Sequence, residues 1–478
     1  MSENCPKDRR AMIAIDLGAE SCRVSLLRWL NESPHIELVH RHANAPVNHN
    51  GEIRWDLCQI TQQMDIGLRK CAEIASEGIR SIAADGWAVD YVRLNADGEA
   101  LADPFCYRDE RTIRSQPEVF QRISAARLRA ITGIEMSRIN SLYQLCADAD
   151  DLQEKPWLTL PEYILHRLGG RRVAEYTNAT HTQLVDAEKR CWSREIFAAA
   201  GLVQAAAAPI VGPGTVIGKP NGRALNLPAL ESAELIAPAC HDTASAIAGI
   251  PDSGDDWAYI SSGTWSLVGT LLSEPSNGPE AQAADFTNLG AVGGRICFHK
   301  NVNGMWMLRQ CMTEWAAEID WTVPELIAAA EQVPPPVALL NVDDPDLLLP
   351  GEMPARINRQ LKRRGLAPLA VGAESAPQMT SLILHSLAVR YREIVSSLAQ
   401  ITGKKLRRIY IVGGGSRNTL LNRLTEAATG LEVRCGAVES ATIGNFAVQL
   451  AALEDPHPEG VAAAAVAHWA QKILSAAL

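Results

Sequence analysis

The chain lacks any pair of cysteines separated by two residues, and its 11 cysteines are scattered along 478 residues. Zinc ribbons and small disulfide-linked folds depend on paired cysteines at short, regular spacings. We therefore expect reduced thiols and a cytoplasmic protein. No apolar run reaches the roughly 20 residues that a membrane-spanning helix needs. The first ten residues also lack the apolar core of a secretory signal.

Two common nucleotide-binding patterns are missing as well. The chain has no GxxxxGK[ST] sequence and no GxGxxG sequence, which disfavours a P-loop NTPase and a Rossmann oxidoreductase. Its formal net charge of −10 argues against a nucleic acid or an anionic membrane as a partner. Small molecules remain the expected partners.

The length and composition are those of a globular protein with more than one domain. The chain is 47% hydrophobic and 21% charged, and 478 residues exceed the size at which a single core keeps growing. Gly249, Pro251 and Gly254 cluster with acidic residues within 247–256, which is typical of a connection between domains. We therefore predict an N-terminal domain over residues 1–248 and a C-terminal domain over residues 249–478.

Strands and helices alternate along both halves, which predicts an α/β fold. The first half has a strand over 11–15, a polar turn over 16–21 and a return strand over 24–27. The second half repeats this order with 257–260, 261–264 and 265–270. Aligning 15–19 on 260–264 superposes the two turns, and we interpret this as a weak internal repeat in which each domain presents a phosphate-binding hairpin to a common cleft. Further expected elements are strands at 36–41, 79–84 and 409–412, and helices at 55–77, 382–398 and 461–474.

The first turn carries a candidate metal and phosphate site. Asp16 ends a buried strand beside Gly18, where it could hold a magnesium ion directly or through water. The backbone N–H groups of residues 18–23 and the Arg23 guanidinium could contact phosphate oxygens. The alternative is an ordinary hairpin with a turn-forming aspartate.

The segment Cys240–Ala246 carries the candidate catalytic base. Asp242 lies beside His241 and among small residues, as suits a carboxylate that accepts a proton from a substrate hydroxyl. The alternative is that Asp242 caps a helix beginning at Ala244. The two roles are compatible, because a helix N-terminus also favours negative charge.

Two further segments have a functional and a structural interpretation. Gly413–Gly415 permits close backbone approach to a nucleotide, or else forms a plain strand-to-helix turn. Trp87, Asp90 and Tyr91 follow a buried strand, where an aromatic ring and a carboxylate could contact a sugar. Core packing of Trp87 is the alternative.

Together these residues resemble the FGGY carbohydrate kinases over nearly the whole chain. The matching segments are 16–21, 85–91, 107–112, 175–180, 241–246, 261–267, 413–415 and 441–445. The resemblance implies two duplicated actin-like (ribonuclease H-like) ATPase domains with a cleft between them. It places the sugar side and the first phosphate hairpin in the N-terminal domain, and the nucleotide side in the C-terminal domain.

The resemblance also implies roles for individual residues. Asp242 would be the proton acceptor. The sugar would contact Trp87, Ala88, His241, Asp242, Thr243 and Asn301. ATP would contact Ala19, Glu20, Ser21, Cys22, Arg23, Thr264, Arg309 and Gly414. The chain departs from the family pattern at Cys22 and Ala88, where glycine is usual, and at Arg309, where glutamine is frequent and where the ATP contact could move to Gln310.

The implied reaction is the phosphorylation of a ketose by ATP with Mg²⁺ near Asp16. We expect L-rhamnulose as the sugar, phosphorylated on its C1 hydroxyl. L-fuculose or a xylulose is the first alternative, which Ala88 leaves open. A non-catalytic actin-like nucleotide-binding regulator is the second, although such a protein would be expected to lose Asp242. We expect a monomer or a weak homo-oligomer.

Overall fold

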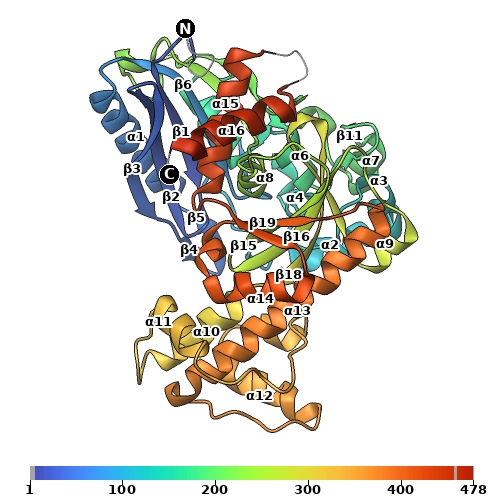
Figure 1. Cartoon of the computed structure of the whole chain (residues 1–478). Coiled ribbons are helices and arrows are strands. Elements are labelled where there is room, and N and C mark those ends of the chain that lie inside the picture. The colour runs from blue at the N-terminus through green and yellow to red at the C-terminus, as the bar shows by residue number, and fades with distance from the viewer. Residues whose placement is uncertain (1–5, 457–459, 477–478) are drawn as a thin grey trace.

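Two six-stranded mixed sheets lie at the centres of the two halves of the computed structural model, which describes residues 6–456 and 460–476 (Figure 1). In the first sheet, β3, β2 and β1 are antiparallel neighbours. On the other side of β1, β6 and β14 run parallel to it. The edge strand β13 is antiparallel to β14. These strands are β1 (Ala11–Leu17), β2 (Ser21–Leu30), β3 (Ser33–Ala43), β6 (Ile79–Gly86), β13 (Thr215–Gly218) and β14 (Glu234–Ala237).

The second sheet repeats the arrangement of the first. The strands β15, β16 and β18 are antiparallel, while β19 and β20 continue in parallel on the other side of β15. The bounds are β15 (Trp257–Ser262), β16 (Trp265–Leu272), β17 (Thr287–Gly290), β18 (Ile296–Asn303), β19 (Arg408–Val412) and β20 (Glu432–Cys435). The order β3-β2-β1-β6-β14 therefore matches β18-β16-β15-β19-β20, and the predicted internal repeat is confirmed.

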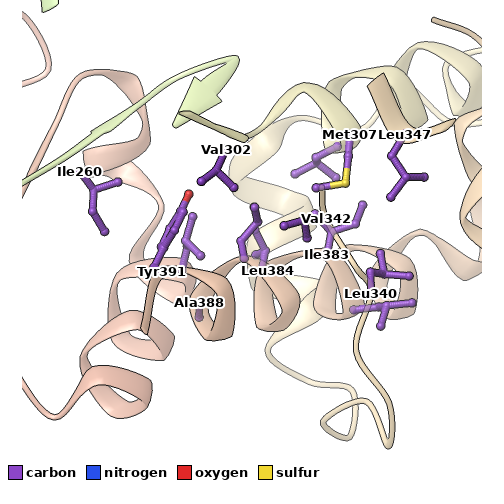
Figure 2. Packing of buried hydrophobic residues seen from close by; sticks show 14 of the residues in the cluster. Ile260, Val302, Met307, Leu340, Val342, Leu347, Ile383, Leu384, Ala388 and Tyr391 are labelled. Atoms are coloured by element: carbon purple, nitrogen blue, oxygen red, sulfur yellow. The ribbon is translucent and has the colours of Figure 1, made fainter. Parts of the chain in front are cut away.

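A long helix forms the centre of the second hydrophobic core. Helix α13 (Ala376–Thr402) packs Leu384, Ala388 and Tyr391 toward Ile260 and Val302 of the sheet (Figure 2). It is longer than the predicted helix over 382–398. Gly403, in the left-handed conformation, ends it.

The last two helices lie against the sheet of the first half. Helices α15 (Ser440–Glu454) and α16 (Ala463–Ala476) lie beside the strands β1 and β3 in Figure 1. Phe446 of α15 and Trp469 of α16 share one buried cluster with Met12 of β1. Helix α15 also crosses α8 (Asp242–Ala248), where a Cβ at Gly444 would overlap the carbonyl of Ser245. The chain's C-terminal end thus joins the two halves.

The remaining elements cover the sheets or extend from them. Helix α1 (Leu57–Ile74) starts two residues later than predicted, because Trp55 belongs to strand β5 and the Asp56 side chain caps the helix. The other helices are α2 (Thr112–Arg122), α3 (Ala125–Thr132), α4 (Ser141–Cys146), α5 (Leu160–Leu168), α6 (Tyr176–His181), α7 (Arg194–Ala200), α9 (Pro279–Ala283), α10 (Trp306–Trp315), α11 (Val323–Ala330), α12 (Met353–Arg363) and α14 (Thr419–Thr429). The short strands are β4 (Pro46–His49), β5 (Glu52–Trp55), β7 (Tyr91–Arg93), β8 (Trp157–Thr159), β9 (Ala174–Glu175), β10 (Val185–Asp186), β11 (Cys191–Trp192) and β12 (Ile210–Val211). Over residues 6–456 and 460–476, no helix is both long and apolar enough to cross a membrane.

Candidate active site

Three carboxylates converge where strands of the first sheet end. Asp16 and Asp85 are direct partners in the parallel pairing of β1 with β6. The next residue of β6, Gly86, forms a bridge with His241, so Asp242 begins helix α8 beside the same strand ends. Parallel strand ends are where α/β proteins commonly bind ligands. The fold therefore brings the predicted metal residue and the predicted base together.

Burial and mutual repulsion raise the pKa values of these carboxyl groups. Burial raises the pKa of Asp16 to about 6, and Arg23, 3.0 Å from its Oδ2, acts in the opposite direction. Burial and the charge of Asp16 raise the pKa of Asp242 to about 7. The pKa of Asp85 is also raised, by burial and then by Asp16. If all three carboxyl groups were ionised, the site would carry more negative charge than its single nearby guanidinium balances.

This excess of carboxylate suits a divalent cation. Oxygen ligands are those that Mg²⁺ prefers, and Oδ1 of the buried Asp85 has no hydrogen-bond partner. Within the described residues, no three histidine, cysteine or acidic side chains lie close enough together to form a complete metal site. The residues thus fit an ion that binds one carboxylate, such as Asp16, and otherwise water and phosphate oxygens.

The segment around Asp242 leaves its carboxylate open to a substrate. His241 is the N-cap residue and Asp242 is the first residue of α8, so the interpretation of Asp242 as an N-cap for a helix starting at Ala244 is wrong. The Thr243 hydroxyl donates to Asp242 Oδ1 at 3.2 Å, and His241 Nε2 lies 3.3 Å from the same oxygen. The Asp242 side chain keeps 35% of its surface exposed. An accessible carboxylate with a pKa near neutrality is well suited to accept a proton.

The first hairpin turn is exposed only at its tip. Gly18 closes the turn through its N–H to the carbonyl of Ser21, and a Cβ at Gly18 would crowd that carbonyl. Ala19 and Glu20 are the more open residues of the turn, whereas the side chains of Ser21 and Cys22 are buried. Burial also raises the pKa of the Cys22 thiol to about 12. Among these predicted ATP contacts, Ala19 and Glu20 are therefore more accessible than Ser21 and Cys22.

Arg23 and Arg309 are both held by carboxylates. Arg23 lies 3.0 Å from Asp16 and 3.5 Å from Glu439, so its guanidinium links the first sheet to the start of α15. Arg309, on α10, pairs with Glu20 at the tip of the first turn. The second pair is exposed and spans the two domains. Their contacts to ATP remain predictions.

The second hairpin and the glycine loop lie side by side. Thr264 is partly exposed at the tip of the β15–β16 hairpin. In the glycine loop, Gly413 adopts φ +81°, and a Cβ at Gly415 would overlap the Ser262 hydroxyl. A Cβ at Gly414 would meet nothing within 4 Å. Only Gly414 of the three glycines therefore faces open space, as a nucleotide contact requires.

On the predicted sugar side, Asp90 is engaged within the protein. Its carboxylate accepts hydrogen bonds from the indoles of Trp55 (2.7 Å) and Trp87 (3.0 Å) and from the Gln144 amide (3.1 Å). The interpretation of Asp90 as a ligand of sugar hydroxyls is therefore wrong. Trp87 packs on Trp55 with ring centroids 4.5 Å apart and is only 6% exposed, which favours its packing role.

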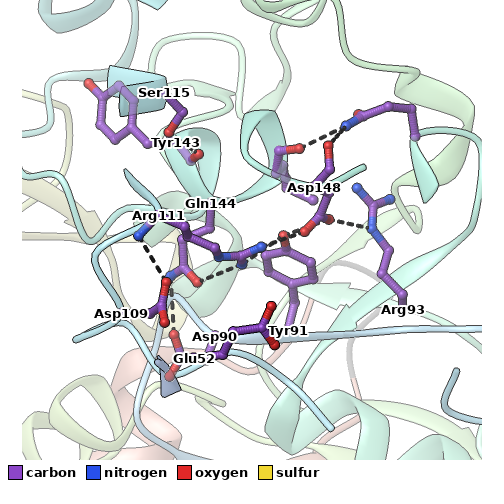
Figure 3. Close-up of polar contacts among 12 residues, drawn as sticks. Glu52, Asp90, Tyr91, Arg93, Asp109, Arg111, Ser115, Tyr143, Gln144 and Asp148 are labelled. Carbon is purple, nitrogen blue, oxygen red and sulfur yellow. Dashed lines mark hydrogen bonds and ion pairs between the residues drawn. The ribbon is translucent and has the colours of Figure 1, made fainter. Parts of the chain in front are cut away.

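The backbone beside Ala88 is strained and firmly held. Val89 has φ +72°, a conformation that a β-branched residue rarely adopts. The Ser141 hydroxyl donates to its carbonyl at 2.6 Å, and the Gln144 amide donates at 3.3 Å. Tyr91 is also structural, because its hydroxyl donates to Asp148 at 2.8 Å (Figure 3).

The polar network behind this turn extends to two arginines. Asp148 is nearly buried and accepts from Arg93 at 2.8 Å and from Arg111 at 2.6 Å (Figure 3). Arg111 also reaches Gln144, whose amide contacts Asp90. This network fixes the position of residues 88–90 at the end of β6.

Asn301 lies on β18 of the second sheet and is exposed. Its amide donates to Glu135 at 3.4 Å. Burial lowers the pKa of His241, and His299, two residues earlier on the same strand, lowers it further. Strand β18 therefore lies near the base, and the contact of Asn301 with a sugar remains a prediction.

Four functional candidates were given no role from the sequence. Asp85 follows a buried strand as Asp16 does, and this similarity could have indicated it. Asn445, His181 and Glu175 have no such local pattern, because their contacts join segments far apart in the chain.

Comparison with solved structures identifies the fold. The chain is similar to xylulose kinase from Lactobacillus acidophilus, with a TM-score of 0.77, 16% identity and coverage of 98% of this chain and 97% of that one. Xylulose kinase from Rhodospirillum rubrum gives a TM-score of 0.76 with 16% identity, covering 96% and 92% of the two chains. The predicted two-domain, actin-like α/β fold is confirmed.

Comparison with family models and sequences identifies the class of enzyme. Residues 11–249 match the N-terminal domain, and residues 258–453 the C-terminal domain, of the FGGY family of carbohydrate kinases. The chain therefore belongs to this family and is a carbohydrate kinase. It is 35% identical over 447 residues to a rhamnulokinase from Bacteroides thetaiotaomicron, covering 92% of this chain and 90% of the relative. A rhamnulokinase from Pectobacterium carotovorum is 36% identical over 454 residues, with 92% and 88% covered.

Proposed function

We propose that this kinase transfers the γ-phosphate of ATP to the C1 hydroxyl of L-rhamnulose. The observation that supports the reaction type is the accessible Asp242 carboxylate, whose pKa is raised to about 7. The two rhamnulokinase relatives, each covering 92% of the chain, support the choice of sugar. We also propose that the enzyme acts in the cytoplasm, where ATP is available.

In the proposed mechanism, Asp242 accepts the proton of the C1 hydroxyl as the oxygen attacks phosphorus in line. His241 and Thr243 position the Asp242 carboxylate through the two contacts to Oδ1. The N–H groups of Ala19 and Glu20 bind phosphate oxygens. Asp16 would hold Mg²⁺ through water, and the ion would supply positive charge to the transferred phosphoryl group.

We further propose a division of labour between the two domains. Residues 1–248 would supply the base, the sugar contacts and the first phosphate turn. Residues 249–478 would bind the nucleotide through Thr264, Arg309 and Gly414, with Asn301 reaching the sugar. The exposed Glu20–Arg309 pair joins the two groups of residues.

The test is the release of ADP from Mg-ATP across a panel of acceptors: L-rhamnulose, L-fuculose, L- and D-xylulose, L-ribulose, D-fructose and glycerol. We expect kcat/KM to be highest for L-rhamnulose. Preference for another ketose would support the proposed reaction type but show that L-rhamnulose is not the preferred sugar. The difference in specificity would then be sought near Ala88. ATP binding without sugar-dependent ADP release would instead favour the regulatory protein.

A further inference from the structure

Two histidines from separate elements meet beside the proposed base, and a third lies within electrostatic reach of both. His181 ends α6, His241 precedes α8, and His299 lies on β18 of the other sheet. Nε2 of His181 lies 3.1 Å from Nδ1 of His241, and the centroids of the two rings are 4.0 Å apart. His299 is buried and its Nδ1 lies 3.1 Å from the Tyr259 hydroxyl.

The segment that carries His181 also holds the backbone next to Asp242. The Glu175 carboxyl accepts from the N–H of Cys240 at 2.8 Å. The Thr177 hydroxyl accepts from the N–H of His241 at 3.2 Å. With the ring contact of His181, residues 175–181 make three contacts to two consecutive residues. These contacts fix both the backbone and the ring of His241.

The protonation states of these groups follow from the geometry. Enclosure of the rings lowers the pKa of His241 to about 3 and also lowers that of His181, so both rings are neutral near pH 7. A neutral imidazole has one donor nitrogen and one acceptor nitrogen. For Asp242 to act as a base it must be ionised, and an ionised carboxylate can only accept. Because Nε2 of His241 lies 3.3 Å from Oδ1 of Asp242, the tautomer with the proton on Nε2 avoids repulsion with the carboxylate and leaves Nδ1 to accept from His181 Nε2–H.

We propose that His181 is a positioning residue for phosphoryl transfer, because its ring N–H holds His241 in the orientation and tautomer that donate to Asp242. This inference rests on the proposed function, in which Asp242 is the base. An N–H of His241 that points at Oδ1 of Asp242, 3.3 Å away, favours the ionised carboxylate. His181 therefore keeps the base more acidic than its buried, negatively charged surroundings alone would allow.

Other charged groups lie near Asp242, His241 and His181 and also influence the pKa of Asp242. Asp242 faces Asp16 of β1, Arg23 of β2 and Asp85 of β6, besides Thr243 of its own helix. His241 and His181 face each other, and each lies within electrostatic reach of His299. Replacing His181 with a neutral side chain leaves the carboxylates and Arg23 unchanged.

The test compares His181→Leu, which removes the donor, with His181→Gln, which can place an amide N–H near the same position. His49→Leu, on the exposed β4–β5 hairpin, is the control. We expect His181→Leu to lower kcat/KM about three- to tenfold, the range for one neutral hydrogen bond. The acid limb of its profile of kcat/KM against pH should shift to higher pH by about half a unit to one unit. His181→Gln should recover most of both changes, and His49→Leu should match the parent.

A purely structural role would lower activity without moving the acid limb, and this outcome would overturn the proposal. Full activity with an unshifted profile in His181→Leu would also overturn it.

Nitrogen-15 NMR of histidine-labelled protein supplies a readout that does not depend on turnover. We expect the His241 signals of the parent, assigned by their loss in His241→Gln, to show a protonated Nε2 and an accepting Nδ1. In His181→Leu the Nδ1 signal should shift toward the value of a free acceptor. If the parent fails to phosphorylate any sugar, the proposed function fails, while the NMR result still decides whether His181 sets the state of His241.

Discussion

Asn445 donates a hydrogen bond of 2.6 Å to Oδ2 of the buried Asp85, across 360 positions of sequence. Asn445 also accepts from Gln449 at 2.7 Å, and Gln449 in turn donates to the carbonyl of Ile13 at 3.1 Å. These contacts attach α15 to β1 and β6, the strands that end at the active site. A C-terminal helix thus helps to hold a carboxylate that belongs to the N-terminal sheet.

We expect Asn445→Ala to lower the free energy of unfolding at pH 8 by about 1–3 kcal/mol, the usual cost of leaving a buried polar group unpaired. The bond favours the ionised form of Asp85, so the loss should shrink as the pH falls and the carboxyl group becomes protonated. Urea unfolding over a series of pH values measures both effects. Asn226→Ala, at an exposed position, is the control and should change the stability by a few tenths of a kcal/mol. A loss that is the same at every pH of the series would contradict the link to Asp85.

Replacement of the proposed base should separate catalysis from binding. We expect Asp242→Asn to lower kcat by about two to four orders of magnitude, because an amide cannot accept the hydroxyl proton. ATP affinity, measured by calorimetry, should stay within about twofold, since the first turn is unchanged. Asp97→Asn, on an exposed loop, is the control. A variant that turns over normally would show that another group accepts the proton.

The carboxylate cluster should reduce stability at high pH. The pKa of Asp16 is about 6 in the folded protein, above its ordinary value of 3.8, because the group is buried. The folded state therefore binds more protons than the unfolded state between these pH values, and stability falls as the pH rises through them. We expect Asp16→Asn to melt at a higher temperature than the parent at pH 8, and the difference to vanish near pH 4. A lower melting temperature at pH 8 would mean that the bond from Arg23 outweighs the burial of charge.

Much of the fold could be predicted because its signals are local. The continuous apolar runs that became β1, β6 and β19 identify buried strands, and the spacing of Leu384, Ala388 and Tyr391 identifies one face of α13. The duplicated hairpins could be aligned because their turns have similar composition. The family resemblance of eight short segments then located the predicted site residues.

The rest depends on contacts between segments distant in the chain. Nothing in the sequence around Asp90 shows that Trp55 and Gln144 satisfy its carboxylate, so a sugar contact was a reasonable but wrong interpretation. The pairing of Arg309 with Glu20, and of His181 with His241, follows only from the packing of separate elements. The helix boundary at Asp242 also differs by two residues, because His241 already occupies the N-cap position.

The glycine loop offers a direct test of how the nucleotide side is built. A Cβ at Gly415 would overlap the Ser262 hydroxyl, whereas a Cβ at Gly414 would meet nothing within 4 Å. We expect Gly415→Ala to push this loop away from the β15–β16 hairpin, to lower stability by about 1–3 kcal/mol and to raise the KM for ATP. Gly414→Ala is the matched control for stability and should leave the melting temperature nearly unchanged.

The double variant Gly415→Ala with Ser262→Gly decides whether the overlap is the cause. Removing the Ser262 side chain takes away the atoms that the new methyl group meets, so part of the lost stability should return, in a non-additive way that a double-mutant cycle measures. If the two substitutions add independently, the Gly415 methyl group disturbs the loop by another route. Should Gly414→Ala raise the KM for ATP without any change in melting temperature, the result would support close approach of the nucleotide to that glycine.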